Sequence, residues 1–281
     1  MSSFDTDRGV IILETAQWDV LQRMVTGPVA DRATYAEGAL VGLEDLGVID
    51  PYGPTAAARE VLAGLMAADA RYTLRRLDPT DTVPVRDLII SLAAPRCTVT
   101  RYDADGIHLY ACDDVEVPHI ALANDHLYPR PMIDDGPDEV FDTLAAAARL
   151  ADIEAAARIM RDIGASGPRA SDFVHDAGTG RWTMAMRMRE DRDRDGFTAT
   201  GQMLTLGVTT MLYEIMEDSN PVVDPNGPSS AIPLRPVLGT EVWAEVSRWL
   251  WANPSSTGSS RSTFAPLRPP GERGRGHHAR R

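Results

Sequence analysis

The stretch RYTLRRLD-PTDTVP-VRDLIISL, residues 71–92, consists of two extended segments joined by a loop between two prolines. Apolar and polar residues alternate along Arg71–Asp78, a period typical of a half-buried strand. Leucine and β-branched residues fill Val85–Leu92, which is therefore predicted to be a second strand. Pro79 and Pro84 bound the segment between them, because proline interrupts the hydrogen-bond ladder of a strand. The stretch therefore predicts two strands joined by a short loop.

The sequence on both sides of this unit predicts further strands. Arg96–Tyr102 and Ile107–Cys112 are predicted to pair as a hairpin, because Asp103-Ala104-Asp105-Gly106 between them is a strong turn sequence. The other predicted strands are Val10–Leu13, His119–Leu122, Arg169–His175, Arg181–Glu190, Phe197–Met203 and Val208–Glu217.

Apolar residues at helical spacing predict helices before, between and after these strands. Two helices begin near Thr15 and Asp31, a third precedes residue 71, and a last one begins near Thr240. A longer helix is predicted from Pro137, where proline and acidic residues favour the first turn. Its apolar stripe consists of Phe141, Leu144, Ala148, Ala151, Ala155 and Ile159.

The order helices–strands–helices–strands–helix predicts an α+β fold, with one central antiparallel sheet and helical bundles attached to it. The repeated order also predicts a quasi-two-fold arrangement of two similar halves. Residues 1–253 are predicted to be a single domain. Residues 254–281 are rich in Ser, Gly, Pro and Arg, so we expect a disordered tail there.

The charged residues limit the classes of function. The chain has no lysine, so Schiff-base chemistry and lysine-dependent phosphate binding are excluded, and its composition indicates a GC-rich genome such as that of actinobacteria. The net charge is −13. The tail carries six arginines and one glutamate, which leaves −18 on residues 1–253. Such a surface repels nucleic acid and anionic lipid, and neither is a predicted partner.

The sequence predicts a cytoplasmic location without membrane insertion. The first ten residues are polar, and no window approaches the roughly 18 apolar residues that span a bilayer. Cys97 and Cys112 could pair, but in the cytosol we expect them to be reduced core residues.

Several motifs suggest catalysis or metal binding, and each has a simpler interpretation. Asp191–Gly196 matches half of an EF-hand loop, but Gln202 replaces the last ligand, so a solvated hairpin turn is predicted. His108, Cys112, His119 and His126 lack the tight paired spacing of zinc ligands. No catalytic residue, metal or cofactor is predicted, and the chain is not expected to be an enzyme; carboxylate chemistry is the alternative left open.

Three methionines alternate with other residues along one predicted strand. Met184, Met186 and Met188 would point to the same face of the sheet. Core packing is one interpretation, and an adaptable binding surface for variable apolar partners is the other.

Several segments together resemble one family of secretion chaperones. They are the helix with Gln17-Trp18-Asp19-Val20-Leu21, the run Leu43–Gly53, the strand with Arg75-Arg76-Leu77-Asp78, the run Val85-Arg86-Asp87-Leu88, and the helix with Val242-Trp243 and Trp249-Leu250. This pattern covers roughly residues 10–252 and is similar to the EspG family of type VII (ESX) secretion chaperones. Residues 186–206 and the arginine-rich tail depart from the family's pattern.

The resemblance implies a function and a contact region. EspG proteins bind newly made PE–PPE heterodimers in the cytosol and keep them soluble for export, which suggests that PE–PPE-like or other small helical secretion substrates are the partners here. The loop between the second and third strands of that fold contacts the substrate. Here this implies the partner-binding residues Pro79, Thr80, Asp81, Thr82, Val83 and Pro84.

Two other functions compete with this one. The N-terminal helices followed by a strand pair are compatible with a winged-helix-like DNA-binding regulator. The short motif Tyr213-x-x-x-Glu217 matches the export signal of type VII substrates, so the chain could also be a secreted cargo of the same system.

Overall fold

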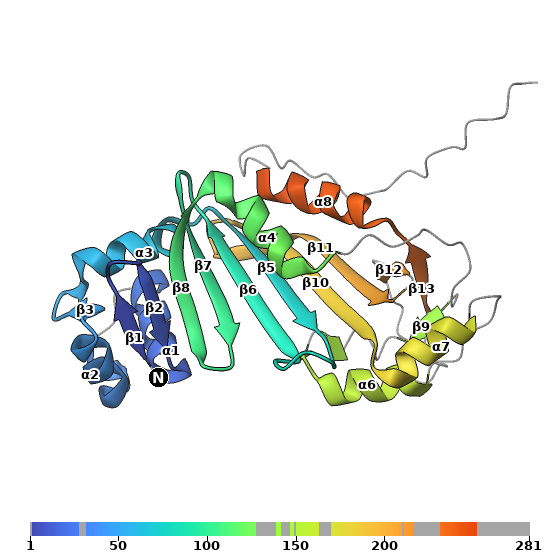
Figure 1. Ribbon diagram of the computed structural model, residues 1–281. Coiled ribbons are helices and arrows are strands. Elements are labelled where there is room, and N and C mark those ends of the chain that lie inside the picture. The colour runs from blue at the N-terminus through green and yellow to red at the C-terminus, as the bar shows by residue number, and fades with distance from the viewer. Residues whose placement is uncertain are drawn as a thin grey trace, which may run out of the picture.

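One antiparallel sheet forms the centre of the computed structural model, which describes residues 2–27, 32–127, 139–141, 147–148, 150–162, 170–209, 211–215 and 231–251. Its strands are β1 (Ser3–Asp5), β2 (Val10–Leu13), β5 (Ala70–Leu77), β6 (Val85–Leu92), β7 (Arg96–Asp103), β8 (Gly106–Asp113), β9 (Glu139–Phe141), β10 (Trp182–Arg192), β11 (Phe197–Val208), β12 (Leu212–Ile215) and β13 (Ala231–Pro236). They are arranged in the order β1-β2-β8-β7-β6-β5-β10-β11-β12-β13-β9 (Figure 1). A separate two-stranded hairpin joins β3 (Ile49–Asp50) to β4 (Gly53–Pro54).

The strand order has the same form on both sides of the central β5–β10 pair. From β5 outward the strands are β6, β7, β8 and β2; from β10 outward they are β11, β12, β13 and β9. The register of the central pair runs from Ala70 opposite Asp191 to Leu77 opposite Met184. This arrangement is the predicted α+β fold with a quasi-two-fold sheet.

Helices cover the sheet on both faces. They are α1 (Thr15–Thr26), α2 (Glu37–Asp45), α3 (Ala56–Ala67), α4 (Val117–Asp125), α6 (Ile153–Asp162), α7 (Ala170–Thr179) and α8 (Gly239–Trp251), with short 3-10 helices η1 (Arg32–Thr34) and η2 (Asp114–Glu116). Figure 1 shows α4 and α8 along one side of the sheet, α1–α3 at the β2–β8 end, and α6 and α7 at the opposite end. None of the described helices is both long and apolar enough to cross a membrane.

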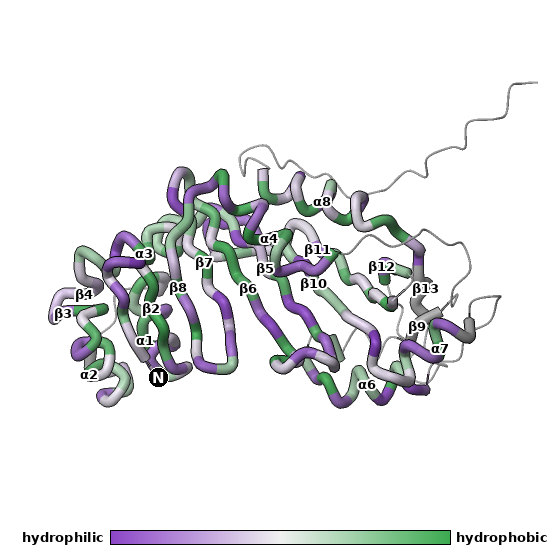
Figure 2. Tube along the Cα trace, in the orientation of Figure 1, coloured by the Kyte–Doolittle hydropathy of each residue, from purple (hydrophilic) through white to green (hydrophobic). Residues whose placement is uncertain are grey.

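Three apolar clusters hold these layers together. One lies under α1–α3 and includes Ile11, Leu13 and Leu62; Figure 2 shows that β2 is hydrophobic along its length. The second lies under α6 and α7 and includes Phe173, and the third lies under α4 and α8 and includes Tyr72. Burial of large side chains of this kind stabilises a fold by about 1.5–3 kcal/mol each.

Helix α3 approaches the sheet more closely than a side chain would allow. Gly64 faces β7, and a Cβ atom at this position would lie 2.2 Å from the Thr98 backbone nitrogen. The Thr98 hydroxyl donates to the Val61 carbonyl oxygen (2.8 Å) and accepts from the Leu65 backbone N–H (3.0 Å). The close approach therefore allows a strand side chain to bond the helix backbone directly.

The structure confirms the strands predicted on either side of the loop and corrects several other predictions. His119–Leu122 was predicted to be a strand but lies in α4, because Asp113 and Glu116 form a capping box and Pro118 favours a first helical turn. Arg169–His175 was also predicted to be a strand, but α7 begins at Ala170. Phe173 and Ala177 of α7 are both buried, which is the spacing of a helix face.

The long predicted helix from Pro137 is interrupted. Phe141 belongs to β9 and pairs with Ala231, and Ala151 has a positive φ of 54°, so α6 begins only at Ile153. Residues 137–138, 142–146, 149 and 163–164 of this prediction lie outside the described residues. The predicted tail, residues 254–281, also lies outside them, so the single-domain boundary at residue 253 stays a prediction.

Candidate partner-binding surface

The loop Pro79–Pro84 joins β5 to β6 and is closed by its own hydrogen bonds. The Asp78 backbone N–H donates to the Pro84 carbonyl oxygen at 2.8 Å. The Asp78 carboxylate accepts from the backbone N–H of Thr80 (3.0 Å) and from its hydroxyl (2.7 Å). These bonds hold the loop in one shape at the end of the central strand pair.

Asp81 anchors this loop to the body of the protein. Its carboxylate accepts hydrogen bonds from Arg76 on β5 (2.8 Å) and from Arg86 on β6 (3.0 and 2.9 Å). Arg76 is buried and also donates to the carbonyl oxygen of Asn124 in α4 (3.1 Å). Hydrogen bonds from Arg86 and from the Val83 backbone N–H hold the pKa of the Asp81 carboxyl far below its usual range. Asp81 therefore has a structural role that its position in a predicted contact loop did not indicate.

We expect the Asp81→Asn exchange to lower stability at neutral pH, because an amide cannot accept the same charged hydrogen bonds. Since the folded pKa of Asp81 is depressed, its stabilisation is complete above the pKa of an exposed aspartate, about 3.9, and is lost as the pH falls below that value. Urea unfolding of both proteins from about pH 7 down to about pH 3, which crosses the pKa of an aspartate in the unfolded chain, measures the difference. A difference that does not shrink in acid would contradict this role, and exposed Asp5→Asn is the control.

The remaining residues of the loop face solvent or a neighbouring groove. Thr80, Thr82 and Pro84 are exposed, and Pro79 and Val83 are half-buried. A groove of about 520 Å³ separates the start of this loop from α6 and the α7–β10 turn. It is lined by Pro79, Thr80, Glu154, Ala157, Arg158, Arg161, Ala177, Gly178, Thr179, Gly180 and Trp182. The loop and the α6–α7 pair thus lie on either side of one groove.

A strip on the adjoining face of the sheet is only partly covered. The cross-strand register places Thr73 opposite both Ile89 and Met188, and Arg75 opposite both Asp87 and Met186, so all six side chains share one face. All of them are half-buried, whereas their neighbours on the other face are buried under α4 and α8. We name this set the open strip: Thr73, Arg75, Asp87, Ile89, Met186 and Met188.

Three of the six side chains of the open strip are apolar, namely Ile89, Met186 and Met188, and its two charged side chains pair with each other. Arg75 donates to both Asp87 carboxylate oxygens, from Nε at 2.8 Å and from Nη2 at 2.7 Å. Met186 packs partly against the cluster under α6 and α7, while Met184 is fully buried within that cluster. Met184 is therefore core, as one interpretation predicted, whereas Met188 is half-buried on the open strip and its role as a binding surface stays a prediction.

A buried ion pair fixes α4 to the opposite face of this same strand pair. Arg187 of β10 donates from Nε to Asp125 Oδ2 (2.6 Å) and from Nη2 to Asp125 Oδ1, and from Nη1 to the Thr205 hydroxyl (2.9 Å). The side chains of Arg187 and Asp125 are 1% and 0% exposed. No local pattern in the sequence indicates this pair, because its partners lie 62 residues apart.

The motifs that suggested metal binding have structural explanations. Asp193 in the β10–β11 turn accepts hydrogen bonds from the backbone N–H groups of Asp195 and Gly196, as the predicted solvated turn requires. Within the described part of the chain, Asp103, Asp105 and His108 form a group of possible ligands, and Cys112, His119 and His126 do not join it. Arg101 donates to the Asp103 carboxylate at 2.5 Å, and the Arg86 guanidinium lies 3.7 Å from the same carboxylate. The negative charge of Asp103 is therefore already paired with arginine.

Comparisons with known proteins give a likeness in structure only. No family profile matches the sequence, and no curated protein matches it. Among solved structures, the chain is similar to EspG5, a type VII secretion system chaperone of Mycobacterium tuberculosis solved in complex with the PE25–PPE41 dimer. The TM-score is 0.50 at 9% sequence identity, and the superposition covers 86% of this chain and 95% of that chain. The chain therefore has the fold of the type VII secretion chaperone EspG5.

Proposed function

We propose that this protein is a cytosolic chaperone or adaptor that binds PE–PPE-like secretion substrates of an ESX type VII system and keeps them soluble for export. The observation that carries the proposal is the shared fold, which extends over 95% of the EspG5 chain. That chaperone was solved with a PE–PPE dimer bound. Binding of this kind requires complementary surfaces and no catalytic group.

The open strip and the accessible residues of the β5–β6 loop are the proposed contact surface. Three apolar side chains and an internally paired charge give the open strip no net charge within an acidic body, so it suits an uncharged, apolar end of a helical partner. Methionine side chains such as Met188 adapt to partners of different shape. The rim of this surface would be formed by the loop residues Pro79, Thr80, Thr82, Val83 and Pro84. Asp81 holds the loop in place.

The DNA-binding alternative finds less support. Helices α1–α3 pack on the end of the sheet, and α2, the counterpart of a recognition helix, buries Ala39, Leu40 and Leu43. The charged residues of α2 are Glu37, Glu44 and Asp45, which repel a phosphate backbone.

The first experiment is co-expression of the full chain with a PE–PPE pair encoded in the same genome, followed by co-purification and a measurement of Kd. We expect the pair to be soluble only with this chain present and to elute with it as a complex. If the pair is equally soluble alone and does not co-elute, the proposed function is wrong.

Two substitutions test the proposed surface. We expect Met188→Asp on the open strip and Val83→Asp on the loop each to weaken binding by about 2 kcal/mol, or about 30-fold in Kd, because each places a charge where an apolar partner docks. Val41→Asp on α2 is the matched control, since Val41 is 48% exposed and lies outside this surface. Circular dichroism of each variant checks that the fold is retained. Unchanged Kd values for both variants, with the wild type still binding, would rule out the surface but not the function.

A further inference from the structure

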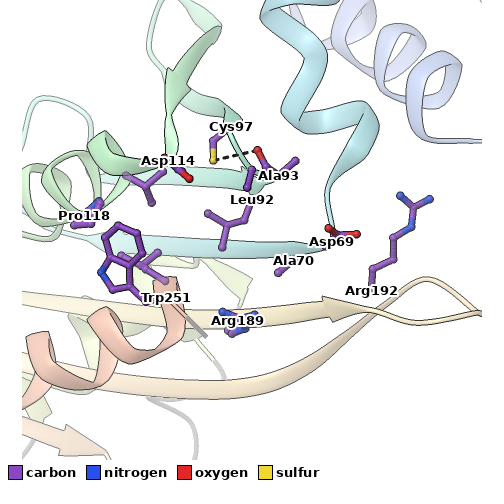
Figure 3. A pocket seen from close by; sticks show the side chains of 13 residues that line it. Asp69, Ala70, Leu92, Ala93, Cys97, Asp114, Pro118, Arg189, Arg192 and Trp251 are labelled. Carbon is purple, nitrogen blue, oxygen red and sulfur yellow. Dashed lines mark hydrogen bonds between the residues drawn. The ribbon is translucent and has the colours of Figure 1, made fainter. Parts of the chain in front are cut away.

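A cavity of about 660 Å³ opens between the start of α4 and the end of α8, away from the proposed contact surface (Figure 3). Most of the residues that line it are apolar, and Cys97 is among them. Figure 3 shows the Cys97 sulfur among the lining side chains, with its hydrogen bond to the Ala93 carbonyl oxygen (3.9 Å). The cavity is lined by Asp69, Ala70, Leu92, Ala93, Ala94, Cys97, Asp114, Val117, Pro118, Arg189, Arg192, Leu250 and Trp251. Cys97 is therefore at the cavity wall, although only 2% of this residue is exposed.

The second cysteine of the chain lies directly opposite the first. Cys97 of β7 and Cys112 of β8 are Cα partners in the antiparallel register, and both belong to the cluster under α4 and α8. Residues directly opposite in such a pair have Cα atoms about 4.5–5.5 Å apart, which falls within the range that a disulfide bridges. Both thiols are free, and the chain has no other cysteine.

The environment makes the two thiols unequal. The hydrogen bond between the sulfurs lowers the pKa of Cys97 to about 7, whereas the same bond and burial raise the pKa of Cys112. Of the two thiols, Cys97 therefore forms more readily the thiolate that attacks a disulfide. The more reactive sulfur is also the one that lines the cavity.

We propose that Cys97 and Cys112 form a modification site for low-molecular-weight disulfides that enter through this cavity. The Cys97 thiolate attacks a disulfide RSSR, a Cys97–SR bond forms, and RS⁻ leaves. Cys112 then loses its proton and attacks the Cys97 sulfur, which closes the Cys97–Cys112 bond and releases a second RS⁻. The two cysteines are oxidised, one RSSR is reduced to two thiols, and the reverse reaction restores the reduced pair that a reducing cytosol maintains.

Glutathione disulfide in excess over the full-length native protein tests the proposal. We expect the wild type to lose the mass of two hydrogen atoms and to retain no glutathione, and peptide mapping to show Cys97 linked to Cys112. Cys112→Ser should keep one glutathione on Cys97. Cys97→Ser should consume glutathione disulfide at least about tenfold more slowly at neutral pH, because the remaining thiol of Cys112 is buried and does not line the cavity.

Three results would overturn the proposal. The wild type could keep a glutathione adduct without closing the bridge, or form disulfide-linked dimers. Cys97→Ser could react as fast as Cys112→Ser. The native chain could also stay unmodified while the urea-unfolded chain reacts, which would show that the cavity gives no access. Mapping of the wild type needs no substitution, so the test does not depend on either variant folding.

Discussion

Gly64→Ala is expected to destabilise the protein by about 3 kcal/mol or more, which is the upper end of the range for overpacking. The added Cβ would lie 2.2 Å from the Thr98 nitrogen and 2.5 Å from the Cys97 carbonyl carbon. Both are backbone atoms of β7, so no side chain can rotate away to make room. Helix α3 would have to move outward, which would break its two hydrogen bonds with the Thr98 hydroxyl.

A second helical glycine provides the matched control for this substitution. Gly38 lies in α2, and a Cβ there would meet no atom within 4 Å. Gly38→Ala should therefore be neutral or stabilise by up to about 1 kcal/mol, because alanine favours the helix. Urea unfolding of the three proteins gives the comparison. Equal stability of the two alanine variants would show that α3 is not in direct contact with the backbone of β7.

Replacement of the buried Arg187 is the second substitution for which we expect a large loss of stability. We expect Arg187→Ala to lower the free energy of unfolding by about 3–5 kcal/mol, because it leaves the Asp125 carboxylate buried without a countercharge. Asp125 is the last residue of α4, so the loss should appear first as weakened attachment of that helix to the sheet. Hydrogen exchange of the α4 amides measures this local effect, and urea unfolding measures the total.

Two further variants distinguish the loss of charge pairing from the loss of packing. Arg96→Ala removes an exposed partner of Asp113 and should cost at most about 1 kcal/mol. The double variant Arg187→Met/Asp125→Leu removes both charges and replaces them with apolar groups, so it should recover most of the stability. If the double variant were as unstable as Arg187→Ala, packing around the guanidinium would be the cause, and the unpaired carboxylate would not.

The sequence predicted those elements whose signals are local. The alternation in Arg71–Asp78 and the prolines at 79 and 84 placed β5, β6 and their loop almost to the residue. The strands predicted at 119–122 and 169–175 were wrong because a short apolar run fits a buried helix face as well as a strand. There the capping box at Asp113 was the better signal.

The candidate site was predictable only in part, for a different physical reason. The loop could be located from its prolines, but the anchoring of Asp81 depends on Arg76 being buried beneath α4. The exposure of the open strip depends on which face of the sheet the helices cover. This is a property of tertiary packing, and the periodicity of a strand does not predict it. Periodicity did indicate that Met186 and Met188 share a face, and the register then placed them beside Thr73 and Arg75.

The central β5–β10 pairing also determines the order of events during synthesis. The two strands are separated by about a hundred residues, which a ribosome adds in on the order of 5–20 s. During that interval β5 is an edge strand of the incomplete sheet, and its unpaired backbone groups can bond with another nascent chain. Three of its eight residues are arginine, and charged side chains on such a border discourage pairing between molecules. Arg71, Arg75 and Arg76 thus place charged side chains on this border before the second half of the chain exists.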